Sequence, residues 1–232
     1  MCGIVGYVGP RDALPLLMTG LRRLEYRGYD SAGVAVQQNG TLEVMRAEGK
    51  LDNLASVVSA HPAAGHTGIG HTRWATHGRP SEQNAHPHVD CGGVTAVIHN
   101  GIIENFEELK APLVARGHRF TSETDTEVAV HMLEEELAKG STLDAAALAV
   151  LPRLEGAAAL AFISAKDPGK IVAARIASAP HPQPMSRKRS PGASRSLVQM
   201  WSSFCSCAVS SESFSFLKYP HEYTMRGSSQ SW

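Results

Sequence analysis

The chain has 232 residues, of which 43% are hydrophobic, and its formal net charge is zero. This length and composition can supply a buried core for one or two domains, and the zero charge gives no long-range attraction to nucleic acid or to an anionic membrane. Because the longest mostly apolar run has about ten residues, no segment is expected to span a bilayer. The four cysteines form no CxxC pair and no signal peptide is visible, so we expect a protein of the reducing cytoplasm.

The first half of the chain predicts strands and helices from its hydrophobic periods. Asn39-Gly40, between two alternating segments, is the strongest short hairpin signal. In chain order we expect a strand at 2–9, a helix at 14–24, a hairpin at 32–49, a short helix at 51–58, and strands at 67–76 and 93–101 separated by an irregular, His-rich loop.

Three helices and a second hairpin are predicted next. The helices are expected at 105–117, 124–140 and 142–154, and the hairpin strands at 157–164 and 170–177. Pro112 should kink or shorten the first of these helices because proline removes a backbone donor. Strands occur in groups and helices occur in groups, so the pattern favours a layered α+β fold over a doubly wound one.

The character of the sequence changes near residue 177. Serine occurs 7 times in residues 1–176 and 15 times in the 56 residues that follow, and the formal charge changes from −4 to +4. Hydrophobic periodicity also ends there. We therefore divide the chain into a domain at 2–176 and a Ser-rich, aberrant tail at 177–232 that is expected to be disordered.

Cys2 directly follows the initiator methionine. A free thiol has a pKa near about 8.5 and needs a base to become a good nucleophile. Removal of Met1 would supply that base, because the α-amino group released on Cys2 has a pKa of about 7.7–8.0. Taken alone, Cys2 favours the simpler interpretation, an ordinary small residue after the start codon, over a nucleophile.

Three further stretches carry polar groups to predicted strand and helix ends. "HTRWATHG" at 71–78 places Arg73 at a strand end, and "HNGIIEN" at 99–105 follows the strand "VTAVI". Asn100 and Gly101 together offer a side-chain amide and a backbone N–H, the two donors that an oxyanion hole requires. Asp125 in "SETDTE" is compatible with a helix cap, and Arg73 alone with a surface salt bridge.

Together, these stretches resemble the class II glutamine amidotransferases, and most of all the glutaminase domain of the glutamine–fructose-6-phosphate aminotransferases. The resemblance covers Cys2 to about Arg175. It rests on "CGIVGY", "GLRRLEYRGYDSAG", "HTRWATHG", "HNGIIEN" and "SETDTE", in that order and spacing. It implies a four-layer αββα sandwich of the N-terminal-nucleophile hydrolase type, here incomplete at its C-terminal strands.

The resemblance also implies the site. Cys2 is the nucleophile, and Asn100 and Gly101 form the oxyanion hole. The substrate-binding residues that it implies are Arg73 for the α-carboxylate of glutamine, Asp125 for its α-ammonium group, Thr76 and His77 for the pocket wall, and Trp74 for a gate. No cofactor and no metal is implied. The partners are L-glutamine and, through an isomerase domain that this chain lacks, fructose-6-phosphate; full-length members would be homodimers.

Two other classes remain open at this point. The cluster of His71, His77, His86, His88 and His99 with Cys91 suggests a metal-binding protein, although its spacings match no compact zinc pattern. The abrupt change near residue 177, where the resemblance ends, suggests a truncated and non-catalytic remnant with an alternatively read 3′ end. We expect the loss of strands to weaken such a fold.

Overall fold

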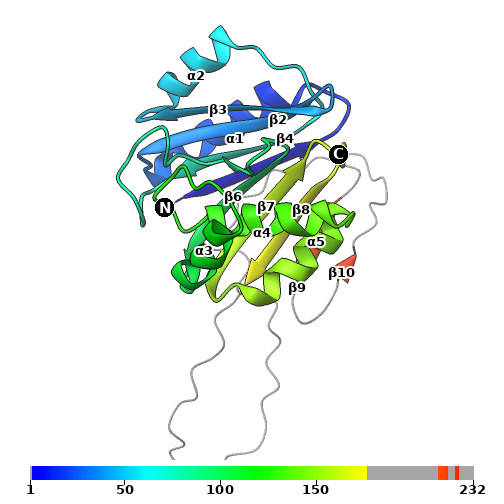
Figure 1. Ribbon diagram of the computed structural model, residues 1–232. Helices are drawn as coiled ribbons and strands as arrows, with labels where there is room; N and C mark the ends of the chain where they lie inside the picture. The colour runs from blue at the N-terminus through cyan, green and yellow to red at the C-terminus, as the bar shows by residue number, and fades with distance from the viewer. Residues whose placement is uncertain (1, 177–213, 219–222, 225–232) are drawn as a thin grey trace, which may run out of the picture.

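Two β-sheets and five α-helices make up the protein in the computed structural model, which describes residues 2–176, 214–218 and 223–224 (Figure 1). One sheet, called sheet A, has the strand order β1-β4-β2-β3. Its strands are β1 (Gly3–Val8), β4 (Thr67–Arg73), β2 (Ser31–Gln38) and β3 (Thr41–Glu48). All neighbouring strands in sheet A are antiparallel.

The second sheet, called sheet B, has the order β10-β9-β8-β7-β6-β5. Its strands are β10 (Tyr223–Thr224), β9 (Phe214–Lys218), β8 (Ile171–Ile176), β7 (Gly156–Ser164), β6 (Thr95–Ile103) and β5 (His88–Val89). Pairing is antiparallel throughout except between β8 and β9, which run parallel.

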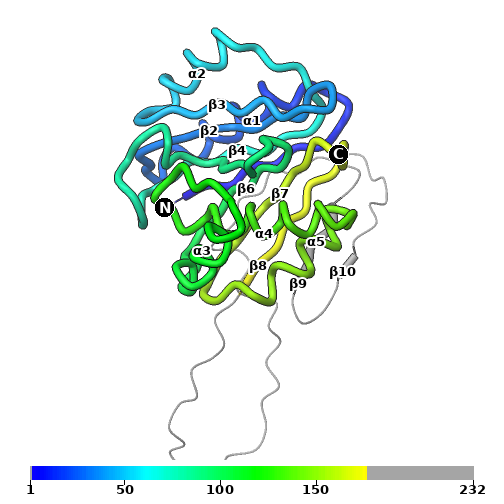
Figure 2. Tube along the Cα trace, in the orientation of Figure 1, coloured from blue at the N-terminus to red at the C-terminus, as the bar shows by residue number. Residues whose placement is uncertain are grey.

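The helices cover the outer faces of the two sheets. Those on sheet A are α1 (Ala13–Leu24), followed by the 3₁₀ turn η1 (Glu25–Arg27), and α2 (Leu51–Ala60). Those on sheet B are α3 (Phe106–Ala115), α4 (Glu127–Ala138) and α5 (Leu143–Val150), which continues into η2 (Leu151–Arg153). Figure 2 traces the chain from its N-terminal end, which lies where the two sheets meet.

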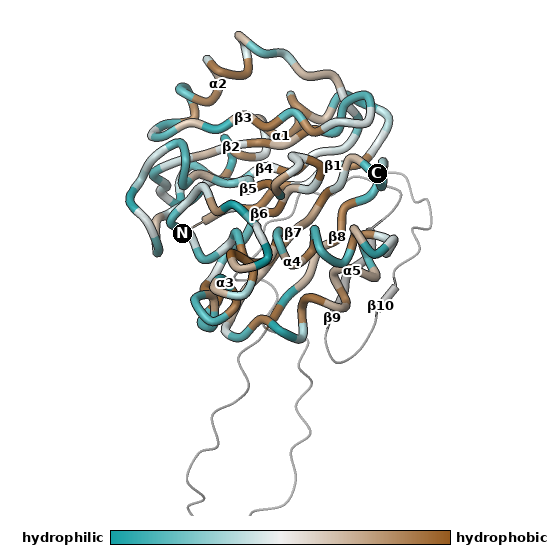
Figure 3. Tube along the Cα trace, in the orientation of Figure 1, coloured by the Kyte–Doolittle hydropathy of each residue, from teal (hydrophilic) through white to brown (hydrophobic). Residues whose placement is uncertain are grey.

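Apolar side chains fill three layers between these elements. Leu17 and Leu21 of α1 pack on one face of sheet A, and Phe162 of β7 packs beneath the helices of sheet B. Ile69 of β4 and Ile98 of β6 belong to a third cluster, between the two sheets. Hydrophobic stretches accordingly lie on the strands, and hydrophilic stretches lie mostly on the loops (Figure 3). Burial on both faces explains why β2 and β4 are buried along nearly their whole length.

The expected α+β class is confirmed by this arrangement, and each predicted helix and strand up to residue 176 is present. Some details differ from the expectation, including the end of β4, which lies at Arg73 rather than at residue 76. The short strand β5 lies within the segment expected to be an irregular loop, β6 continues two residues beyond Gly101, and α3 continues for three residues past Pro112. Pro112 lacks the N–H that would donate to the Glu108 carbonyl oxygen, and α3 ends at Ala115, two residues before the expected end.

The predicted disordered tail lies mostly outside the described residues. Only β9 and β10 fall within 177–232, and there β9 pairs with β8. The boundary near residue 177 and the character of the rest of that segment stay predictions. No helix in the described residues is long and apolar enough to cross a membrane, and the cytoplasmic location also stays a prediction.

Candidate active site

Cys2 immediately precedes β1, one of the two edge strands of sheet A. Gly3 pairs with Thr72 of β4, so the thiol lies beside the residues that follow β4. The backbone N–H of Trp74 donates to Cys2 Sγ over 3.2 Å, and Sγ lies 3.6 Å from the Trp74 carbonyl oxygen. A Cβ atom at position 3 would lie only 2.6 Å from Leu24 Cδ1, so glycine allows β1 to approach α1 this closely.

The environment of Cys2 favours its neutral thiol. Burial raises the pKa of the Cys2 thiol, while the Trp74 N–H and the charge of Arg73 lower it to a smaller extent. A thiol whose pKa is raised above its ordinary value stays protonated at neutral pH, so it needs a base to take up its proton before it can attack a carbonyl carbon.

Asn100 reaches Cys2 from the opposite sheet. Its side-chain Nδ2 donates to the Cys2 carbonyl oxygen over 3.4 Å, and its Oδ1 lies 2.6 Å from His71 Nε2. Burial lowers the pKa of His71 to about 3, so this ring is neutral and its Nε2–H donates to Oδ1. His71 therefore turns the amide N–H groups of Asn100 toward Cys2.

The sequence predicted no role for His71 in the site, although its spacing from Arg73 could have indicated one. Residues two apart on a strand face the same side, so His71 and Arg73 share one face of β4.

The next residue after Asn100, Gly101, has φ of 125°, and a Cβ atom there would lie 2.0 Å from the Ala157 carbonyl oxygen. Only glycine fits this position, because both its backbone conformation and its neighbours exclude a side chain.

Arg73 is the last residue of β4 and is only 3% exposed. Its Nη2 donates to the carbonyl oxygens of His77 and Gly78, whereas its Nη1 is buried without a hydrogen-bond partner among the described residues. Burial lowers the pKa of Arg73, and the nearby carboxylates of Asp30 and Asp125 raise it. A buried guanidinium group with a free donor is suited to a carboxylate.

Asp125 lies before α4 and is also 3% exposed. Its Oδ2 accepts the backbone N–H of Ile103 over 2.8 Å, and its Oδ1 lies 3.9 Å from His99 Nδ1. The helix-cap alternative is therefore not supported, because α4 begins at Glu127 and Thr126 occupies the N-cap position. The carboxylate instead joins the start of α4 to the end of β6.

The loop after β4 carries the other residues expected in the site. Trp74 is 54% exposed and lies against Gly28, and Thr76 is exposed. The ring of His77 packs edge-on against Phe106 at 5.3 Å between centroids. The carboxylate of Asp30, to which the sequence assigned no role, accepts the backbone N–H of Ala75 and so holds this loop in place.

The buried histidines pack around these residues. Thr126 Oγ1 is hydrogen-bonded to His86 Nε2 and His99 Nδ1, and Thr124 Oγ1 to His88 Nε2. Burial lowers the pKa of all three rings, so they are neutral. Among the described residues, none of the five histidines in the metal hypothesis belongs to a group that could hold an ion. Of the residues in that hypothesis, only Cys91 belongs to such a group, and its partners there are residues that the hypothesis did not include.

Three comparisons with known proteins agree with this arrangement. A family model described as a glutamine amidotransferase domain matches residues 71–190. Glutamine–fructose-6-phosphate aminotransferase from Streptomyces coelicolor is 57% identical over 176 residues, which cover 75% of this chain and 29% of that protein. The enzyme of the same name from Pyrococcus horikoshii is 51% identical over 175 residues, with the same coverage.

Solved structures share the fold. Glutamine phosphoribosylpyrophosphate amidotransferase from B. subtilis has a TM-score of 0.58, 26% identity, and coverage of 71% of this chain and 35% of that one. A structure described as the allosteric regulatory enzyme of purine biosynthesis has a TM-score of 0.62 and 26% identity, covering 71% and 36%.

The two sheets and the residues around Cys2 thus define an amidotransferase domain of class II. The chain belongs to the glutamine amidotransferase domain family, and it matches the N-terminal region of glutamine–fructose-6-phosphate aminotransferase. It spans about 29% of the length of the curated relatives that it matches.

Proposed function

We propose that this chain hydrolyses the side-chain amide of L-glutamine, releasing ammonia and glutamate. The observation that carries the proposal is the buried guanidinium of Arg73, whose Nη1 has no partner among the described residues, next to the thiol of Cys2. An amino acid substrate would supply the missing carboxylate to Arg73 and its ammonium group to Asp125. Thr76, His77 and Trp74 would border the substrate.

In the proposed mechanism Cys2 is exposed by removal of Met1. Its α-amino group takes the thiol proton, and the thiolate attacks the amide carbon of glutamine. The negative charge then develops on the amide oxygen, where Asn100 Nδ2 and the Gly101 N–H would stabilise it. The amine returns the proton to the leaving nitrogen, ammonia departs, and a γ-glutamyl thioester remains. Water activated by the same amine then hydrolyses the thioester to glutamate and regenerates the thiol.

The architecture supports this proposal. Helices outside two facing sheets, with the nucleophile at the first strand, fit the four-layer αββα sandwich of N-terminal-nucleophile hydrolases. We further propose that ammonia from this domain serves glucosamine-6-phosphate formation from fructose-6-phosphate, as the names of the relatives suggest. That acceptor step would require the isomerase domain, which belongs to the part of the relatives beyond the 29% that the chain matches.

The direct test is a glutaminase assay on the full chain, without a tag at either end. We expect equal amounts of ammonia and glutamate from L-glutamine, and mass spectrometry should find Cys2 as the first residue. L-asparagine, one methylene shorter, should be a poor substrate because its amide cannot reach Cys2 while Arg73 holds the carboxylate. Folded protein that begins with Cys2 and releases no ammonia would exclude the proposal and favour the remnant hypothesis.

The oxyanion role of Asn100 gives a separate prediction. Asn100→Ala should lower kcat for glutamine by about 10²–10³-fold with little change in KM, because the donor acts on charge that is present only in the transition state. Asn53→Ala in α2 is the matched control, since Asn53 is exposed and its side chain bonds only the Glu48 carbonyl oxygen among the described residues. A rise in KM at constant kcat would instead assign Asn100 to substrate binding.

A further inference from the structure

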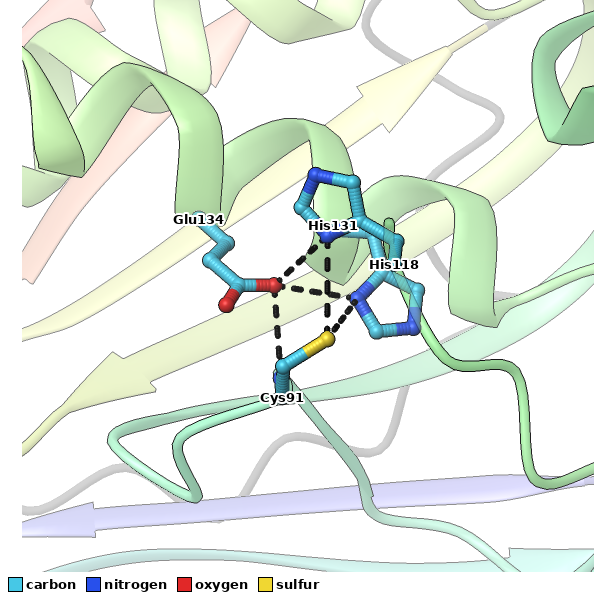
Figure 4. Close-up of side chains that lie close together, drawn as sticks. All are labelled: Cys91, His118, His131 and Glu134. Atoms are coloured by element: carbon cyan, nitrogen blue, oxygen red, sulfur yellow. Dashed lines mark hydrogen bonds and ion pairs between the residues drawn. The ribbon is translucent and has the colours of Figure 1, made fainter. Parts of the chain in front are cut away.

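Four side chains with metal-ligating atoms meet on the helix-covered face of sheet B, outside the proposed glutaminase site. They are Cys91, His118, His131 and Glu134, and their ligating atoms all lie within 4.8 Å of one another (Figure 4). Cys91 lies in the turn between β5 and β6, and His118 lies between α3 and α4. His131 and Glu134 are three residues apart on α4, so they share one face of that helix.

Four of the six distances between the ligating atoms are close to those of a tetrahedral zinc site, and the other two are no longer than 4.8 Å. Cys91 Sγ lies 3.7 Å from Nδ1 of both His118 and His131. Glu134 Oε2 lies 2.9 Å from His118 Nδ1 and 3.1 Å from His131 Nδ1. Zn–S bonds of about 2.3 Å and Zn–N and Zn–O bonds of about 2.0–2.1 Å imply edges of about 3.6 Å between sulfur and nitrogen and about 3.3 Å between nitrogen and oxygen.

Residues around these four side chains orient the ligating atoms through hydrogen bonds, as the residues that surround the ligands of a metal site do. His118 Nε2 lies 3.2 Å from Glu135 Oε1, so its Nε2–H can donate there and leave the Nδ1 lone pair facing the cluster. Arg116 forms an ion pair with Glu135 and balances its charge. The backbone N–H of Arg119 donates to Cys91 Sγ over 3.4 Å, an interaction that stabilises a thiolate.

The types of ligand atom in the cluster indicate which metal ion it would bind. One sulfur, two imidazole nitrogens and one carboxylate oxygen suit zinc, whereas calcium and magnesium prefer oxygen ligands alone. A thiolate and a carboxylate together balance the charge of Zn²⁺. The side chain of His131 is 1% exposed, while those of His118 and Glu134 are 11% and 26% exposed, so the cluster is mostly enclosed but open to solvent on one side.

We propose that Cys91, His118, His131 and Glu134 bind one Zn²⁺ ion in a closed, structural site. Four protein ligands fill a tetrahedral shell, so no position remains for a reacting water. The ion would join the β5–β6 turn, the segment before α4 and α4 itself, which the sequence separates by 27 and 13 residues. It stabilises the region just beyond Asp125, and its presence does not depend on glutaminase activity.

The test measures metal directly on the untagged full chain. After purification and dialysis against metal-free buffer, we expect about one zinc per chain by elemental analysis. Cobalt exchanged for zinc should give the visible absorption of a tetrahedral ion and a thiolate-to-cobalt charge-transfer band in the near ultraviolet. A chain with Cys2→Ala, Cys205→Ser and Cys207→Ser together retains Cys91 as its only thiol and should keep that band.

Variants of the cluster complete the experiment. Cys91→Ser added to the same chain should abolish the charge-transfer band, whereas His61→Ala, a change of an exposed histidine, should leave it unchanged. Glu135→Gln should weaken zinc binding by about 10–100-fold through its effect on His118. Wild-type chain that retains no zinc and shows no thiolate–cobalt band would overturn the proposal, even if Cys91→Ser does not fold. A band that persists without Cys91 would do the same.

Discussion

Replacing Cys2 with alanine should abolish the release of ammonia from glutamine. Removal of the nucleophile from a covalent hydrolase costs about 10⁶-fold in kcat, which places the variant below the detection limit of an ordinary assay. The melting temperature should change little, because Cys2 precedes β1 and its half-buried side chain bonds only the backbone of Trp74 among the described residues. Ammonia release by Cys2→Ala at the wild-type rate would contradict the proposed mechanism.

Two controls separate the thiol from the terminal amine. An alanine inserted between Met1 and Cys2 keeps the thiol but moves the free amine away from it, so activity should also be lost. Cys205→Ser, in the segment outside the resemblance, should retain the wild-type rate.

Because burial raises the pKa of the Cys2 thiol, the thiol depends on the α-amino group as its base. The amine can accept a proton only when it is itself unprotonated. The value of kcat/KM should therefore rise with pH through about 7.7–8.0 and then level off.

Arg73→Lys and Asp125→Asn should each lower kcat/KM for glutamine by about 30- to 5,000-fold. Truncating one partner of a buried, hydrogen-bonded charge pair costs about 2–5 kcal/mol, and this range converts to those factors. Lysine keeps the charge of Arg73 but cannot make the same set of bonds to His77, Gly78 and a carboxylate. Arg22→Lys is the matched control, because among the described residues the side chain of Arg22 forms only an exposed ion pair with Asp52.

Substrate analogues identify which charge each residue binds. 4-Aminobutanamide lacks the α-carboxylate, so Arg73→Lys should cause no further loss with it. 4-Carbamoylbutanoate lacks the α-amino group, so Asp125→Asn should cause no further loss with that analogue. An equal loss on glutamine and on the analogue would mean that the residue supports the fold of the site rather than the substrate.

The secondary structure up to residue 176 could be predicted because its signals are local. The leucines of α1 recur at helical spacing, and Asn39-Gly40 closes the β2–β3 hairpin as its turn preference demands, with Asn39 at φ of 50° and Gly40 at 79°. The order β1-β4-β2-β3 lacks such a signal. It depends on which strands bury their apolar faces against α1 and against sheet B, and no single segment contains that information.

The candidate site also contains residues that the sequence could predict and contacts that it could not. Cys2, Arg73, Asn100 and Asp125 could be selected from their motifs and the family resemblance. His71 could not be assigned as the partner of Asn100, because the two belong to different sheets and meet only when the sheets face each other. The bond from Ile103 to Asp125 likewise resolved a choice that the sequence left open between a helix cap and another role.

By itself, the sequence determined the helices and strands, the family, and the residue types available for the chemistry, because these follow from local periodicity and from motifs of fixed spacing. Tertiary structure alone decided which polar groups are buried together. It packed His71, His88 and His99 around His86 without making an ion-binding group of them among the described residues. It joined Cys91 to His118, His131 and Glu134 instead. The physical reason is that burial and proximity, which set hydrogen bonding, pKa and metal geometry, arise from packing between segments far apart in the chain.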